Sequence, residues 1–195
     1  MTTRGSLRVI GYKGGVAFDE YVLNTTSHST DWGHAFSPFV LGPVRLYDEG
    51  EAQCVENGWQ FSKVYPCHVD PKTGDPASAY YTWAKRGWES QQARRYPMGK
   101  GVVPAYSWWA GHRLGYIEAR RTIFIPLYLQ AVRRTLEFVY LADLVRGGWK
   151  IVLRDFDGYD HKRLGMSYDD VVNCESKTMG HAFVLAMAIE EALRT

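Results

Sequence analysis

The apolar residues of this chain come in short runs that glycine and proline interrupt. The longest run, Ile123 to Leu129, has seven residues and contains Pro126. A helix that spans a membrane needs about 20 apolar residues, so we expect no membrane span. Of the 195 residues, 46% are hydrophobic and 23% are charged. These proportions are typical of a folded domain with its own core, and we predict a single domain over residues 1–195.

Cysteine usage and charge narrow the class of protein. The chain has three cysteines, an odd number without a CxxC pair, and no apolar segment at its start. A disulfide scaffold or a zinc ribbon is therefore not expected, and a reducing compartment is. The net charge of +2 argues against a dedicated nucleic-acid coat protein, although it leaves room for a local basic groove. We expect a cytoplasmic protein of prokaryotic or viral origin.

The spacing of apolar residues, glycines and prolines predicts more helix than strand. Strands are expected at residues 7–12, 39–46 and 149–153. Helices are expected at residues 53–65, 75–95, 107–121 and 135–146, and from Ser176 or Thr178 to Leu193, with Asp75 and Ser107 as N-cap residues. The longest loops are expected at residues 13–35 and 154–176. The predicted fold class is α+β, a mainly helical domain with a few short strands.

Three polar residues of the helix predicted at 53–65 share one face. Glu56, Gln60 and Lys63 follow one another at i, i+4 and i+7, which on a helix places them within about 40°. Trp59 lies one step round the same side. A carboxylate can move protons, and an amine can attack a carbonyl carbon. The alternative is an ordinary solvated face, since charged helical stripes usually lie at the surface.

A basic cluster follows the next predicted helix. Arg94, Arg95 and Lys100 stand beside Gly99 and Gly101. Guanidinium groups and the backbone N–H groups of a glycine-rich turn can hold phosphate, although the spacing matches no P-loop. The alternative is that these cations only stabilise the negative end of the helix dipole.

Carboxylates follow the strand predicted at 149–153. Asp155 and Asp157 come just after its carboxyl end, where polar side chains are well placed for chemistry. Together with Asp160 they are spaced superficially like a calcium loop, but the glutamate at the twelfth position of such a loop is missing. The six histidines show no HxH or HExxH pattern. We therefore expect no metal and no cofactor.

Taken in chain order, these motifs resemble the NADAR (NAD- and ADP-ribose-associated) family, which includes an N-glycosidase of the riboflavin pathway. Glu56, Trp59, Gln60 and Lys63 fill all four positions of its signature helix, E-x-x-[FYW]-Q-x-x-K. Other matches are Ile10 to Tyr12 for the first strand, Phe36 to Phe39 for the [FL]-S-N-F motif, Ala93 and Arg94 for an A-R pair, Trp109 seven residues before Tyr116, and Lys177 to Gly180 for an N-x-[LM]-G helix start. Pro38 and Lys177 each stand where the family has asparagine.

The resemblance implies a NADAR-like fold and an N-glycosidase that needs no cofactor. By the same resemblance, Lys63 takes an opened ribose as a Schiff base, and Glu56 moves a proton or holds ribose hydroxyls. Asp155 or Asp157 assists, and Arg94 and Lys100 pair with phosphate. The other residues implied to bind substrate are Trp59, Gln60, Trp109, Phe36, Lys177 and Gly180. Of the two adjacent tryptophans on the helix predicted at 107–121, Trp109 is expected to face the ligand and Trp108 to pack.

The implied substrate is a nucleotide, a ribosylamine or an ADP-ribosyl compound, either free or attached to a base of a nucleic acid. Two alternatives stay open. A non-catalytic protein that sequesters or senses ADP-ribose-like ligands fits the loss of the asparagine at Pro38. A structural protein would carry Glu56 and Lys63 only as surface charges. The aligned acid and amine favour the enzyme, because a binding protein has no need of them. The oligomeric state stays open.

Overall fold

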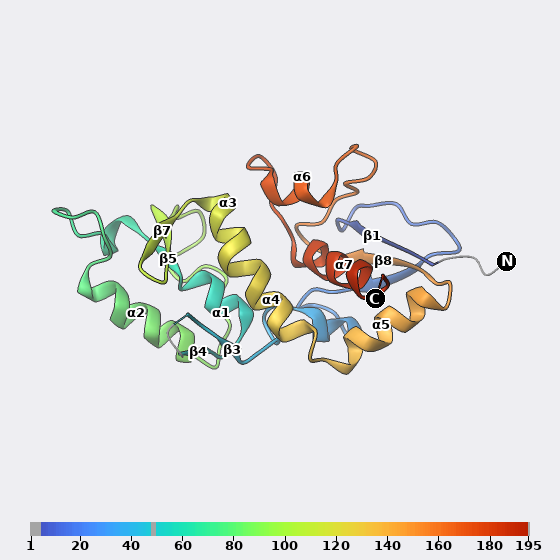
Figure 1. Ribbon diagram of the computed structural model, residues 1–195, viewed down its shortest axis with the longest axis horizontal. Coiled ribbons are helices and arrows are strands. Elements are labelled where there is room, and N and C mark those ends of the chain that lie inside the picture. Colours follow the sequence, from blue (N-terminus) through green and yellow to red (C-terminus); the bar gives the residue numbers. More distant parts are fainter. Residues whose placement is uncertain (1–4, 48–49, 195) are drawn as a thin grey trace. The chain divides into compact units, whose positions relative to one another are not determined.

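The computed structural model describes residues 5–47 and 50–194 and has an α+β fold (Figure 1). The chain divides into two compact units. The terminal unit consists of Met1–Val40 and Tyr128–Thr195, and the central unit is the continuous segment Leu41–Leu127. The fold class predicted from the sequence is therefore confirmed, whereas the single domain over residues 1–195 stays a prediction.

A three-stranded parallel sheet lies at the centre of the terminal unit. Its order is β1 (Ser6–Ile10), β8 (Lys150–Arg154) and β2 (Tyr21–Asn24), with β8 paired to both neighbours. The three central residues of β8 are buried, as expected of a parallel strand whose two faces are both covered. The strands predicted at 7–12 and 149–153 are confirmed.

Helices cover this sheet. α5 (Leu136–Arg146) begins after Thr135, whose hydroxyl accepts a hydrogen bond from the backbone N–H of Phe138, and ends at Gly147. This confirms the helix predicted at 135–146. α7 (His181–Ala192) is buried along most of its length because it packs against β1, β8, α5 and α6.

Three predictions for the terminal unit are wrong in part. The segment 13–35, predicted as a loop, contains β2 and the start of the 3-10 helix η1 (Trp32–Phe36). The segment 154–176, also predicted as irregular, contains the whole of α6 (Tyr168–Asn173). α7 starts after Gly180 rather than at Ser176 or Thr178. β2 and α6 are short, and β2 depends on pairing with β8, a strand that is distant in sequence. α4 (Ile125–Val132) contains the boundary between the two units.

The central unit combines short helices with two small antiparallel sheets. One sheet pairs β3 (Val44–Arg45) with β4 (Glu51–Ala52). The other has the order β5-β6-β7, built from β5 (Lys63–Val64), β6 (Tyr106–Trp109) and β7 (His112–Leu114). The helical elements are α1 (Val55–Gln60), η2 (Pro66–His68), α2 (Ser78–Glu89), α3 (Tyr116–Ala119) and the π-helical turn η3 (Arg120–Phe124).

The helix predicted at 107–121, with Ser107 as its cap, is wrong over residues 107–115 and holds only from Tyr116, where α3 begins and continues into η3. This segment is mainly the β6–β7 hairpin, in which Trp109 pairs with His112 across a two-residue turn. Both turn residues, Ala110 and Gly111, have positive φ angles of 50° and 84°. Positive φ at both positions is the geometry of the tight hairpin turn, so the turn and not the apolar spacing decides the structure.

Other helices and one strand are shorter than predicted. The helix predicted at 53–65 is α1 and ends at Gln60, and the one predicted at 75–95 is α2. Ala77, not Asp75, is the N-cap residue of α2. Asp75 instead accepts hydrogen bonds from Arg113. The strand predicted at 39–46 shrinks to β3.

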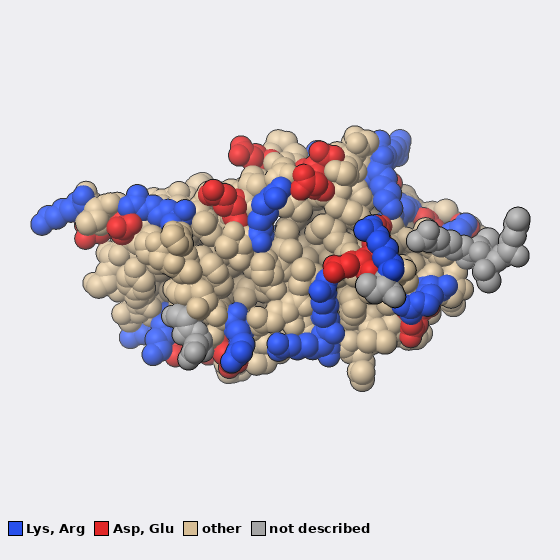
Figure 2. All heavy atoms as spheres, in the orientation of Figure 1, with Lys and Arg blue, Asp and Glu red and all other residues tan. Residues whose placement is uncertain are grey.

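None of the helices within residues 5–47 and 50–194 combines the length and the apolar character that crossing a membrane requires. On the face drawn in Figure 2, acidic and basic side chains are interspersed. This agrees with the near balance of 23 basic and 21 acidic residues along the chain.

Candidate functional site

The candidate lysine of the central unit lies on a strand and not on a helix. α1 begins after Cys54, whose sulfur accepts the N–H of Asn57, and its last residue is Gln60. The chain then turns, and Lys63 opens β5, where it pairs with Ser107 of β6. The predicted helical stripe through Lys63 is therefore wrong in its geometry.

The turn nevertheless brings the three predicted side chains together. Nε2 of Gln60 donates a hydrogen bond of 2.9 Å to Oε1 of Glu56. Nζ of Lys63 donates one of 2.8 Å to Oε1 of Gln60. Glu56 and Gln60 are buried, at 5% and 7% exposure, while Lys63 is partly buried. We call Glu56, Gln60 and Lys63 the polar triad; it links an acid to an amine through one amide.

The surroundings of Lys63 favour its neutral form. Its pKa falls to about 8, chiefly because burial penalises the charged ammonium. The carboxylate of Glu56 opposes this shift, and the Arg95 cation adds to it. Nζ of Lys63 also lies 4.7 Å from the centre of the Trp59 ring. An amine with a pKa near 8 is a usable nucleophile at neutral pH, whereas an ordinary lysine is almost wholly protonated.

Trp59 therefore contacts the amine as predicted from its place beside the stripe. Its ring also packs edge-on against Phe124 of η3, with ring centres 5.6 Å apart. The fully buried Arg120 opens the same π-helical turn, which packs against α1. π-helical turns are frequent at functional sites. From the sequence, the pair Arg120 and Arg121 is expected to lie on a solvated helix face, or alternatively to help hold a nucleic-acid backbone or a pyrophosphate. The burial of Arg120 shows that the solvated face is wrong for this residue.

The basic segment after α2 is anchored by a residue that the sequence analysis misses. The buried Asn57 donates hydrogen bonds to the carbonyl groups of Ser90 and Gln92 and accepts one from the N–H of Arg94. Asparagine is unfavourable inside a helix, and its position here was the sequence feature that could have indicated an anchoring role for Asn57. Asn57 thus ties the segment that leads to Arg95 onto α1.

The predicted phosphate ligands are accessible. The side chains of Arg94 and Lys100 are exposed. The cation that lowers the pKa of Lys63 is instead Arg95, the residue that follows Arg94. Arg95 is therefore the cation that the structure associates with the polar triad, and a phosphate role for Arg94 and Lys100 stays a prediction.

The two adjacent tryptophans diverge for a different reason from the one predicted. Trp108 and Trp109 belong to β6, where successive side chains point to opposite faces of the sheet rather than 100° apart. Trp109 packs against Tyr47, with ring centres 4.8 Å apart. Both tryptophans are partly buried. A ligand contact for Trp109 stays a prediction.

In the terminal unit, Asp155 follows the carboxyl end of β8 and is 3% exposed. Its carboxylate accepts hydrogen bonds from the backbone N–H groups of Ala182, at 3.0 Å, and Asp157, at 3.4 Å. It also lies 3.1 Å from Nδ1 of His181, whose Nε2 lies 2.8 Å from the carbonyl oxygen of Thr25. Asp155 therefore joins β8 to the first turn of α7, where a negative charge is favourable.

The other residues predicted at this end of the sheet have different surroundings. Gly180 touches Asp155 so closely that a Cβ atom would lie 2.2 Å from its Oδ2, so only glycine fits. Asp157 is partly exposed, and Lys177 is exposed with Nζ 5.3 Å from the centre of the Tyr159 ring. Phe36 is fully buried, and its ring packs against Trp32 as part of the core.

The structure thus assembles predicted residues in each unit. Glu56, Trp59, Gln60 and Lys63 form one cluster in the central unit, and Asp155 and Gly180 form another in the terminal unit, with His181 as the partner that sequence reasoning missed. Within the described residues, no group of three or more His, Cys, Asp or Glu side chains could hold a metal ion.

Comparison of the chain with protein-family models, with curated proteins and with solved structures finds no match.

Proposed function

We propose that the protein is an N-glycosidase that hydrolyses the N-glycosidic bond of a nucleotide, a ribosylamine or an ADP-ribosyl compound. The observation that carries the proposal is the polar triad, in which a lysine with a pKa of about 8 is oriented through Gln60 by a buried carboxylate. The resemblance of these residues to the signature helix of the NADAR family points to the same chemistry.

The proposed reaction uses Lys63 as a nucleophile. When the bond between C1′ and O4′ of a ribosylamine breaks, the sugar opens and C1′ becomes an imine carbon. The neutral amine of Lys63 adds to C1′, its two protons pass to the substrate nitrogen, and the bond between C1′ and that nitrogen breaks so that the nitrogen leaves as a free amine. The lysine imine that remains is hydrolysed by water, which releases the sugar as an aldehyde and restores the lysine.

The neighbours of Lys63 have supporting roles in this proposal. Glu56 holds the amide of Gln60 so that its oxygen faces the amine, and it supplies the acid/base carboxylate. The Trp59 ring shields the amine from water. Arg94, Arg95 and Lys100 supply positive charge for a phosphate group on the substrate.

Borohydride trapping tests the proposal. A lysine imine with ribose 5-phosphate or ADP-ribose is reduced by borohydride to a stable secondary amine. We expect peptide mass spectrometry to find the added sugar on Lys63. Lys63→Arg is expected to lose this adduct, because a guanidinium does not give up its proton to become a nucleophile.

The matched control is Lys72→Arg, which changes an exposed lysine of the central unit and should leave the adduct on Lys63 unchanged. An adduct spread evenly over exposed lysines, with none enriched at Lys63, would refute the nucleophilic role.

A non-catalytic protein that binds ADP-ribose or a nucleotide is the alternative. The observation that favours it is the burial of Glu56 and Gln60, whose polar atoms already bond within the chain. Calorimetry separates the two functions. ADP-ribose that binds in the calorimeter but is never trapped on Lys63 would support the binding protein and exclude the enzyme.

A further inference from the structure

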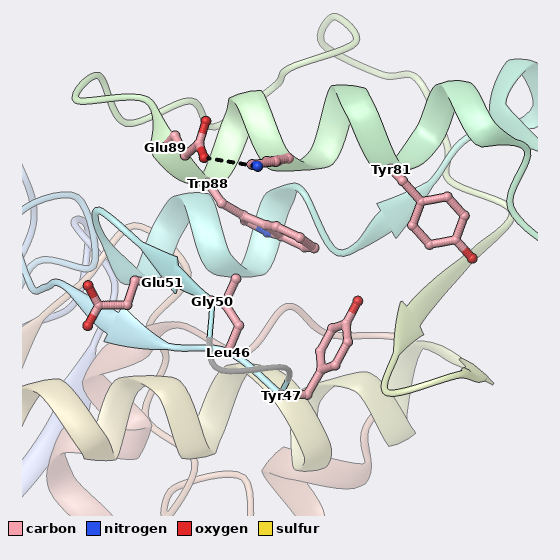
Figure 3. A pocket seen from close by; sticks show the side chains of 8 residues that line it. Leu46, Tyr47, Gly50, Glu51, Tyr81, Trp88 and Glu89 are labelled. Atoms are coloured by element: carbon pink, nitrogen blue, oxygen red, sulfur yellow. Dashed lines mark ion pairs between the residues drawn. The ribbon is translucent and has the colours of Figure 1, made fainter.

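A second site in the central unit shares no residue with the polar triad. A cavity of about 340 Å³ opens between α2 and the β3–β4 hairpin (Figure 3). Its aromatic lining comes from Tyr47, Tyr81 and Trp88. Small-molecule pockets begin at roughly this size, so the cavity can admit a compact organic ligand.

The rings that line the cavity are held in place by packing. Tyr47 meets Trp88 nearly at a right angle, 85°, with ring centres 6.4 Å apart. On another side, Tyr47 contacts Trp109 at 4.8 Å. Tyr81 is fixed by an edge contact of 5.4 Å with Tyr80, whose hydroxyl donates to the carbonyl of Phe61. Little ordering of these rings is therefore needed when a ligand enters.

The rings of the cavity favour a cation more than its charged side chains do. Glu51, Lys85 and Glu89 also belong to the lining, but Figure 3 shows the carboxylate of Glu51 directed away from the rings. Nζ of Lys85 lies 3.9 Å from Glu89 in an ion pair (Figure 3). The ion pair leaves Glu89 and Lys85 close to neutral together, and the faces of the three aromatic rings carry partial negative charge that attracts a cation.

We propose that this cavity binds an organic cation with an alkylated ammonium head group. Such a head is weakly hydrated and needs no hydrogen-bond acceptor, so walls made of aromatic rings suit it. The nearly perpendicular rings of Tyr47 and Trp88 form two adjacent walls, as in aromatic cages that bind such ions, and Tyr81 adds a third ring to the lining. The proposal does not depend on the glycosidase reaction.

Calorimetry on the whole chain tests this with two probes of the same shape. Choline carries a trimethylammonium head, and 3,3-dimethylbutan-1-ol is its uncharged counterpart. Choline is expected to bind, and the alcohol to bind roughly tenfold more weakly or not at all, because it lacks the cation–π attraction. Equal binding of both probes would show a merely apolar cavity and overturn the proposal. So would the absence of choline binding up to about 50 mM, above the millimolar range expected of a few such contacts.

Substitutions at exposed positions keep the test independent of folding. Tyr81→Leu should weaken choline binding roughly tenfold, whereas Tyr81→Phe, which keeps the ring, should retain it. Lys85→Met removes a like charge and should tighten choline binding roughly threefold. Tyr140→Leu, on α5 of the terminal unit, is the control that should change nothing. Unchanged binding in Tyr81→Leu, or weaker binding in Lys85→Met, would contradict the assignment.

Discussion

Lys63 and Asp155 are two charged residues whose neighbours give them different roles. The amine of Lys63 is partly buried and makes one hydrogen bond, to Gln60. Asp155 is 3% exposed and is surrounded by the N–H groups of α7 and the ring of His181. Carboxylates that are buried and bonded in this way stabilise a fold. Lys63 is therefore the stronger catalytic candidate, and Asp155 is better explained as a structural residue.

The two charges near Lys63 predict opposite shifts of its titration. Glu56→Gln removes a charge that raises the pKa of Lys63, so the midpoint should move below about 8. Arg95→Gln removes a charge that lowers this pKa, so the midpoint should move above about 8. Each change is expected to be roughly half a pH unit. The measurement is the pH dependence of covalent labelling of Lys63 by an amine reagent, followed by peptide mass spectrometry.

Labelling of the exposed Lys72 in the same samples is the internal control, and neither substitution should alter its pH profile. Shifts of Lys63 in the same direction for both variants would show that its pKa is governed by a change in burial rather than by these charges.

Among the elements, α7 shows most clearly how close contact between two segments restricts the residue type at one position. The helix packs against β1 and β8, and its first turn receives Asp155. Gly180 makes this possible, since its backbone lies against the carboxylate with no room for a side chain. A single methyl group at this position must push the helix away from the strand, and close-packed interiors resist such shifts.

Gly180→Ala is therefore expected to lower the free energy of unfolding by about 1–3 kcal/mol. The matched control is Gly15→Ala, where an added Cβ atom meets nothing within 4 Å. Its effect should stay within about 0.5 kcal/mol. Urea unfolding followed by circular dichroism measures both variants. Equal stability of the two variants would mean that α7 can shift without cost.

At the scale of the whole molecule, paired strands of the terminal sheet lie far apart in the sequence. β1 and β2 lie near the start of the sequence, yet both pair with β8, at residues 150–154. The central unit, Leu41–Leu127, is formed by the intervening chain and contains local pairs such as the β6–β7 hairpin. Contacts between distant residues carry a larger entropy cost of loop closure than local ones.

This topology predicts an order of folding. Backbone amides of β1 and β2 should become protected together with those of β8, because β8 provides their hydrogen-bond partners. Amides of the β6–β7 hairpin should be protected earlier, since local pairs form fastest. Pulsed hydrogen exchange during refolding, read by mass spectrometry of peptides, measures this order. Protection of β1 before β8 would contradict it.

Elements with a strong local pattern can be predicted from the sequence alone. α5 lies between the Thr135 cap and Gly147, and β8 is a buried apolar run; both follow from neighbouring residues. The members of the polar triad were also predictable as a group, although on a helical stripe that does not exist. Their residue types and close spacing remain informative, because three side chains within eight residues can meet in more than one local conformation.

Elements and contacts that depend on distant partners become visible only in the folded chain. β2 exists because it pairs with β8, and Lys63 belongs to a strand because it pairs with Ser107. Asp155 is buried because His181 and the first turn of α7 close over it. Local periodicity measures only which face of an isolated element is apolar. The burial of a charged group, and therefore its chemical role, depends on which distant segments pack around it.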